Sequence, residues 1–229
     1  MKDSAHNIVA LVPMRHSSER VQGKNYRELQ GKPLYHHIVQ TLLDVPAISQ
    51  VVIDTDSPLI TADAATAFPE VTVLARPESL LGGDVPMNAI LEHDVQQVHA
   101  DYYLQTHSTN PLLTAATIDG AIAKFLSSLA TYDSLFTVTA LQTRLWTSDG
   151  RPLNHDPRVL LRTQDLEPVY EENSCLYLFR AETLLATGNR IGERPLLWPI
   201  DPHEALDIDD EHDWGVVAAI TAARSASER

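Results

Sequence analysis

A short segment near the start of the chain joins a predicted strand to a basic loop. Residues 8–12 are five consecutive apolar residues, which predict a strand buried on both faces. The loop that follows carries Arg15, Arg20 and Lys24, and it contains Gly23. Cationic side chains and free backbone N–H groups at the carboxyl edge of a sheet bind anionic ligands in open α/β folds. The segment therefore predicts a phosphate site.

The distribution of charge supports this prediction. The chain has 229 residues and a formal net charge of -14. Five of its 17 basic residues nevertheless lie within 18 positions, namely Arg15, Arg20, Lys24, Arg27 and Lys32. Local positive charge in an acidic protein indicates an anionic ligand. The alternative is that these side chains are solvated and pair with Glu19 and Glu28.

An acidic segment near the end of the chain is the second candidate site. Residues 201–214 hold seven of the 31 acidic residues. Asp207 and Asp209 are two positions apart, so on an extended segment both carboxylates point to one side, roughly 6.5–7 Å apart at the backbone. Such oxygen ligands suit Mg²⁺, which also binds substrate phosphates. The alternative is that this segment caps the last helix, a role we assign to Asp210 and Glu211.

Two familiar nucleotide-binding motifs are excluded by spacing. A Walker loop would need glycine at the position of Ser18 and serine or threonine at the position of Asn25. No pair of glycines stands in a G-x-G arrangement. The sequence therefore indicates neither a P-loop ATPase nor a dinucleotide-binding enzyme.

Composition bounds the class of protein. Hydrophobic residues make up 44% and charged residues 21%, which is ordinary for a globular protein. No segment approaches the roughly 18 uninterrupted apolar residues of a membrane span. The single cysteine, Cys175, allows no intrachain disulfide, and no apolar signal region precedes the first strand. We therefore expect a cytoplasmic protein. The pI near 5.0 argues against nonspecific binding to nucleic acid or to a membrane surface.

The elements that must position these residues alternate along the chain. Strands are predicted at 8–12, 51–56, 71–74, 102–105, 134–140 and 173–179, and helices at 33–43, 57–67, 86–99, 115–130, 181–186 and from about 210 to 223. This order predicts one α/β domain over 1–229, with a mostly parallel sheet and helices on both faces. Residues 141–172 interrupt it with several prolines, which indicates a functional excursion.

The basic loop resembles a known signature. The pattern is Arg15-x-x-Ser18-x-Arg20-Val21-x-Gly23-Lys24-Asn25, followed by Leu29-x-Gly31-Lys32-Pro33-Leu34. It resembles the signature of sugar-activating cytidylyltransferases, in particular the acylneuraminate (CMP-sialic acid) synthetases. The usual sialic-acid form has Lys-Gly at Glu19 and Arg20, and Leu-Pro or Ile-Pro at Val21 and Gln22. Arg20 is closer to the enzymes that activate the eight-carbon acid Kdo.

The resemblance implies a three-layer Rossmann-like nucleotidyltransferase fold and a reaction of CTP with a 2-keto acid sugar that gives a CMP-sugar and pyrophosphate. It implies Mg²⁺ as cofactor and a homodimer formed through the 141–172 excursion. The implied nucleotide-binding residues are Arg15, Ser18, Arg20, Lys24, Asn25, Arg76 and Asp84, and the implied metal ligands are Asp207 and Asp209. The implied sugar-binding residues are Gln105, Asn110, Arg162 and Gln164.

The proposed chemistry also fits the residues themselves. Attack of a sugar hydroxyl on the α-phosphate builds negative charge on oxygen, which Arg15 and Lys24 as catalytic residues would neutralise. His107 is either a general base or a structural histidine. For Arg76 and Asp84 the alternatives are an ion pair with Glu78 and a helix cap. Two other functions stay open, a Kdo-type or other sugar nucleotidyltransferase and a nucleotide-binding module without catalysis.

Overall fold

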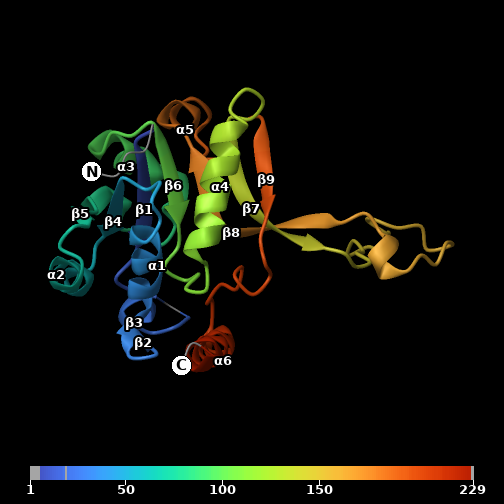
Figure 1. Ribbon diagram of the computed structural model, residues 1–229, viewed down its shortest axis with the longest axis horizontal. Helices are drawn as coiled ribbons and strands as arrows, with labels where there is room; N and C mark the ends of the chain where they lie inside the picture. The colour runs from blue at the N-terminus through green and yellow to red at the C-terminus, as the bar shows by residue number, and fades with distance from the viewer. Residues whose placement is uncertain (1–5, 19, 228–229) are drawn as a thin grey trace.

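The central sheet has seven strands in the order β5-β4-β1-β6-β8-β7-β9 (Figure 1), in a computed structural model that describes residues 6–18 and 20–227. Only β8 runs antiparallel to its neighbours, so the predicted mostly parallel sheet is confirmed. The strands are β1 Ile8–Met14, β4 Gln50–Thr55, β5 Thr72–Ala75, β6 Tyr102–Thr106, β7 Ser134–Leu141, β8 Val169–Phe179 and β9 Pro195–Pro199.

Helices cover both faces of this sheet, as predicted. They are α1 Leu34–Leu43, α2 Pro58–Ala67, α3 Met87–Gln97, α4 Ala115–Ser127, α5 Ala181–Thr187 and α6 Glu211–Ser227. On one face α1, α2 and α4 bury Ile38, Ile60 and Ile118 in the largest apolar cluster. On the other face α3 and α5 bury Leu91 and Leu184 in a second cluster. The α6 helix packs apart from both, on a third cluster.

The register of the sheet brings the carboxyl ends of several strands to one edge. Val12 of β1 lies opposite Ile53 of β4, and Leu11 lies opposite Gln105 of β6. All seven residues of β1 are buried, which explains its uninterrupted apolar sequence. The polar loops after β1, β5 and β6 therefore begin at the same edge of the sheet.

The excursion is a long β-hairpin that projects away from the sheet (Figure 1). Pairing between β7 and β8 continues to Leu141 and Val169, and residues 142–168 form the tip. The sequence predicted that the second strand begins at Asn173, but it begins at Val169. Glu171 and Glu172 belong to this strand, where both are exposed, so their charges carry no burial cost.

Two further elements were not among the predicted strands. Residues 195–199 form β9, whose Pro195 and Pro199 lie at its two ends on the edge of the sheet. A two-stranded hairpin of β2 Glu28–Leu29 and β3 Lys32–Pro33 precedes α1 and was not predicted. Among the described residues, no helix has both the length and the apolar character that crossing a bilayer requires.

Candidate active site

A cavity of about 590 Å³ opens where the loops after β1, β5 and β6 meet. The start of α3, Ser174 of β8 and the acidic segment before α6 complete its wall. The cavity brings together nine of the predicted site residues: Arg15, Ser18, Arg20, Lys24, Asn25, Arg76, Asp84, Asp207 and Asp209. The basic loop and the acidic pair thus face one space, although they lie at opposite ends of the sequence.

The basic loop is shaped by Gly23 and Asn25. Gly23 has a φ of 64°, and a Cβ atom there would come within 2.7 Å of the Tyr26 ring, so the turn requires glycine. Asn25 is buried, and its Nδ2 donates to the carbonyl oxygen of Arg15 at 2.8 Å. Its Oδ1 accepts from the Ser108 hydroxyl at 2.7 Å. Asn25 therefore ties the basic loop to the loop after β6, while the Arg15 side chain stays exposed.

Lys24 links the basic loop to the acidic pair. Its Nζ donates to the carbonyl oxygen of Ile208 at 2.6 Å, directly between the two aspartates. Burial lowers the pKa of Lys24, and the carboxylates of Asp207 and Asp209 oppose that shift. Arg20 forms an ion pair of 2.8 Å with Asp209, and both of these side chains are substantially exposed.

Asp207 and Asp209 fit a divalent cation. Asp207 Oδ1 is buried and has no hydrogen-bond partner among the described residues, and a bound cation would satisfy it. Burial raises the pKa of Asp207, and the neighbouring charge of Asp209 adds to the effect. Two carboxylates that line a cavity beside Lys24 form a donor set suited to Mg²⁺.

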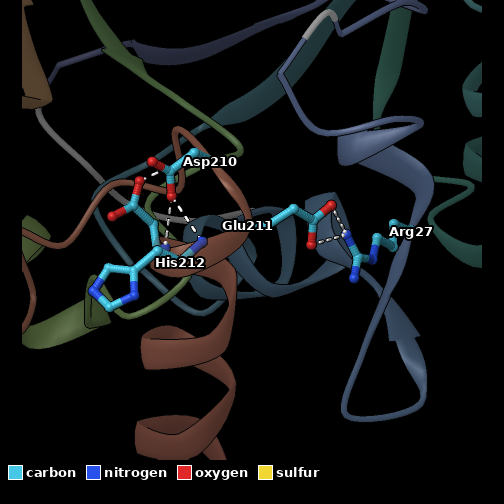
Figure 2. Close-up of polar contacts among 5 residues, drawn as sticks. Arg27, Asp210, Glu211 and His212 are labelled. Carbon is cyan, nitrogen blue, oxygen red and sulfur yellow. Dashed lines mark hydrogen bonds and ion pairs between the residues drawn. The ribbon is translucent and has the colours of Figure 1, made fainter.

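The acidic residues that follow serve the helix. Asp210 Oδ1 accepts from the backbone N–H groups of His212 and Asp213 at 2.8 and 3.0 Å, which caps α6 (Figure 2). One guanidinium nitrogen of Arg27 donates to both carboxylate oxygens of Glu211, at 2.7 and 2.8 Å (Figure 2). The Arg27 guanidinium also lies 4.2 Å from the centre of the Trp214 ring. Arg27 thus has a structural role, and it is not among the described residues that line the cavity.

At the other end of the cavity, Arg76 and Asp84 line the wall. Arg76 is only 7% exposed, and its Nε donates to Asp54 rather than to Glu78. The N-cap of α3 is Pro86, with no side-chain cap hydrogen bond, so Asp84 does not cap this helix. The two structural alternatives for these residues are therefore not observed.

Gln105 and Asn110 lie behind the wall, outside the described lining of the cavity. Gln105 is fully buried, and its Oε1 accepts from Arg190 at 2.7 Å. Because Arg190 can only donate, the amide Nε2 must face the carbonyl oxygen of Thr106 and the Nε2 atom of His107. Asn110 donates to the carbonyl oxygen of Leu206 at 3.4 Å. In this arrangement both predicted sugar ligands position their neighbours rather than face the cavity.

His107 does line the cavity. Burial, together with the positive charges of Arg190 and Lys24, lowers the pKa of His107 to about 4. Its Nε2 lies 3.1 Å from the amide nitrogen of Gln105 and therefore accepts, which leaves the proton on Nδ1. Arg190, which the sequence did not single out, thus adds its positive charge to the effect of burial on His107 and also binds Gln105, the hydrogen-bond partner of His107.

Arg162 and Gln164 lie on the projecting hairpin, away from the cavity of their own chain (Figure 1). The Arg162 side chain is 73% exposed and pairs with Asp165 at 2.7 Å. The carbonyl oxygen of Gln164 accepts from Gln142 at 2.9 Å. These two predicted sugar ligands therefore do not line the cavity of their own chain.

Comparison with known proteins decides the family. Residues 9–195 match the profile described as Cytidylyltransferase. The chain belongs to the cytidylyltransferase family. This confirms the broader resemblance and the prediction of a nucleotidyltransferase. Relatives of two kinds match this cytidylyltransferase at low identity, some named for acylneuraminate or legionaminic acid and others for 3-deoxy-manno-octulosonate.

Three curated relatives illustrate the range. The chain is 26% identical to N-acylneuraminate cytidylyltransferase A of Danio rerio over 94% of its own residues, and it spans 54% of that relative's length. It is 27% identical to CMP-N,N'-diacetyllegionaminic acid synthase of Legionella pneumophila, over 91% of this chain and 94% of that protein. It is 31% identical to 3-deoxy-manno-octulosonate cytidylyltransferase of Chlorobaculum parvum, over 78% of this chain and 68% of that protein.

Solved structures share the fold. CMP:2-keto-3-deoxy-manno-octonic acid synthetase complexed with CTP superposes with a TM-score of 0.68 at 17% identity, over 95% of this chain and 99% of that chain. A 4-diphosphocytidyl-2C-methyl-D-erythritol synthase superposes with a TM-score of 0.65 at 16% identity, over 94% of this chain and 99% of that chain. The predicted α/β nucleotidyltransferase fold is confirmed.

Proposed function

We propose that the protein transfers the cytidylyl group of CTP to a hydroxyl of a 2-keto acid sugar and releases pyrophosphate. The observation that carries this proposal is the single cavity in which the cations Arg15 and Lys24 face Asp207 and Asp209. The match to the cytidylyltransferase family supports CTP as the nucleotide. The relatives that are named for acid sugars suggest an acid sugar as the acceptor.

The reaction needs no protein nucleophile. The sugar hydroxyl loses its proton to water, and its oxygen forms a bond to the α-phosphorus. The bond from that phosphorus to the bridging oxygen of the β-phosphate breaks, and pyrophosphate leaves with the electron pair. Arg15 and Lys24 would neutralise the negative charge that develops on the phosphate oxygens. Asp207 and Asp209 would hold Mg²⁺, which would supply positive charge to the phosphates. Neutral His107 lies in the same wall as a hydrogen-bonding group.

Our first candidate for the acid sugar is a nine-carbon, sialic-acid-like nonulosonic acid. The match to the legionaminic acid synthase covers 91% of this chain and 94% of that relative. An eight-carbon octulosonic acid is the second candidate, because Arg20 resembles the Kdo pattern and the Chlorobaculum relative is 31% identical.

The test is a panel of nine-carbon and eight-carbon 2-keto acids, each incubated with CTP and Mg²⁺, with the CMP-sugar detected by mass spectrometry. We expect a product from a nine-carbon acid. A product from the eight-carbon acid alone would select the second candidate. CTP binding without any product from the panel would contradict acid-sugar transfer.

We also propose that the protein is a homodimer in which the hairpin tip completes the partner's sugar site. The tip exposes a run of apolar side chains, Trp146, Leu153, Val159, Leu160 and Leu161, of which Leu160 is 88% exposed. Such a surface on a projecting arm suits burial against a second copy. Arg162 beside it would then offer its guanidinium to the carboxylate of the sugar.

A further inference from the structure

Two buried carboxyl groups lie beneath the cavity, between the sheet and α3. Asp54 on β4 is 1% exposed and Asp94 on α3 is 0% exposed. Asp54 Oδ2 and both carboxyl oxygens of Asp94 have no hydrogen-bond partner among the described residues. Burying unpaired carboxylate oxygens carries a large desolvation cost, so something must compensate for it.

Arg76 compensates for only one of the two. Its Nε donates to Asp54 Oδ1, and its NH2 group donates to the carbonyl oxygen of Asp54 at 3.3 Å. One guanidinium facing two carboxylates leaves one excess negative charge in a dry layer. A single proton would balance that charge, and it would also allow a hydrogen bond between the carboxyl groups of Asp54 and Asp94.

A metal ion would balance the charge less well. One ligating atom from each of Asp54, His93 and Asp94 lies within 4.8 Å of the others, which is compatible with a cation. A divalent ion, however, would leave the group of Asp54, Asp94 and Arg76 with one excess positive charge beside a buried guanidinium. The charge balance therefore favours a proton.

We infer that Asp94 holds a proton, donates it in a hydrogen bond to Asp54, and so fixes Asp54 as the anchor that keeps Arg76 in the cavity wall. Asp94 and Asp54 are positioning residues, because only Arg76 of the three lines the cavity. Loss of the proton would place a second negative charge next to Asp54. The ionised Asp94 would then compete with Asp54 for Arg76, and water would enter the space between the sheet and α3.

The surroundings of Asp94 support this assignment. Burial and the charge of Asp54 raise the pKa of Asp94 to about 8, and Arg76 opposes the shift. His93 is the neighbouring titratable group on α3 itself. The strand β1 and helix α5 meet α3 with apolar side chains, including Leu11 and Leu184. Among the described residues, the charges that act on Asp94 are those of Asp54 and Arg76.

The first test reads the proton directly and does not depend on the proposed function. In ¹³C NMR of the intact protein labelled at aspartate carboxyls, one signal should titrate well above pH 6 and should disappear in Asp94→Asn. The inference is overturned if every aspartate titrates below pH 5. It is also overturned if the purified protein contains one bound metal ion per chain that Asp94→Asn removes.

The second test uses CTP binding and rests on the proposed function, because it takes CTP as the ligand. Asparagine mimics the protonated acid, since its amide can donate to Asp54 and cannot ionise. Between pH 7 and pH 9 we expect the wild-type affinity for CTP to fall about tenfold, the scale of one weakened charged hydrogen bond, and that of Asp94→Asn to stay level.

The matched control is Asp119→Asn on α4, an exposed aspartate on the opposite face, which should follow the wild type. Asp94→Leu, which can neither donate nor ionise, should bind CTP weakly already at pH 7. An equal fall in affinity for the wild type and Asp94→Asn would overturn the inference. If the wild type bound no CTP at pH 7, the proposed function would fail, and the NMR titration would still decide the state of Asp94.

Discussion

The Nζ atom of Lys24 donates a hydrogen bond of 2.6 Å to the carbonyl oxygen of Ile208, which stands between Asp207 and Asp209. The Ile208 side chain is fully buried in the same apolar cluster as Val21. A basic loop and an acidic segment that are 184 residues apart are therefore held together by both polar and apolar contacts. This contact places a cation and two carboxylates against the same cavity.

Lys24→Ala is expected to lower kcat/KM for cytidylyl transfer by about 10²-fold or more, the scale of losing one preorganised donor to the transition state. Arg27→Ala is the matched control, because Arg27 pairs with Glu211 and contacts Trp214 outside the cavity. It should change turnover little. Steady-state kinetics on both variants decides the matter, and equal losses would mean that the basic cluster acts only as a diffuse field.

Removal of Mg²⁺ by a chelator is expected to abolish turnover, because Asp207 offers a buried oxygen that has no partner among the described residues and suits the ion. Asp207→Asn should raise the Mg²⁺ concentration needed for half-maximal rate by about tenfold or more. Asp210→Asn should leave this requirement unchanged, since Asp210 caps α6. If the two variants responded alike in a Mg²⁺ titration, the assignment of the metal ligands would be wrong.

Arg190→Met is expected to raise the pKa of His107 from about 4, because the positive charge of Arg190 is one cause of its low value. A histidine whose pKa is lowered on folding contributes stability above pH 6.5, and that contribution is lost as the pH falls from 6.5 towards 4. In Arg190→Met this loss should be smaller. NMR titration of the imidazole measures the shift.

Arg180→Met is the control for this experiment, since Arg180 also lies over a tyrosine ring, 5.0 Å from the centre of Tyr102. Arg180 is not among the residues whose charge acts on His107. Its removal should leave the pKa of His107 where it is. An unchanged pKa in Arg190→Met, or the same shift in both variants, would contradict the role given to Arg190.

Mixing subunits is expected to restore activity if the hairpin works in trans. An Arg162→Ala subunit keeps an intact cavity, and a Lys24→Ala subunit keeps an intact tip, so a mixed dimer regains one complete site. Activity should therefore reappear on mixing. If subunit exchange is demonstrated by a separate label and activity stays absent, Arg162 does not complete the partner's site.

The sequence predicted those parts of the fold that depend on local pattern. The apolar run of β1, the helix begun after Pro33, and the Asp207-Ile208-Asp209 segment were found because burial and spacing are readable over a few residues. The start of β8 was not predicted, because Glu171 and Glu172 are exposed and this part of the strand has no apolar pattern in the sequence. Pro195 and Pro199 lie at the two ends of β9, and this edge strand was not among the predicted strands.

The parts of the site that the sequence missed depend on contacts between distant residues. Asp94 lies on a helix 40 positions after Asp54, and no local pattern indicates that the two carboxyl groups are buried together. Gln105 was expected to face a ligand, but its amide oxygen accepts a hydrogen bond from Arg190 instead. The direction of such a side chain depends on contacts in the packed fold, and the spacing of residues in the sequence does not predict it.

The most direct test of the central claim is pyrophosphate release from CTP, measured with Mg²⁺ in the presence and absence of the acid sugar that the panel identifies. We predict release that requires both the sugar and Mg²⁺ and that is far faster with CTP than with ATP or GTP. Release from ATP or GTP at the same rate, or release that does not depend on the sugar, would contradict the assignment of acid-sugar cytidylyl transfer.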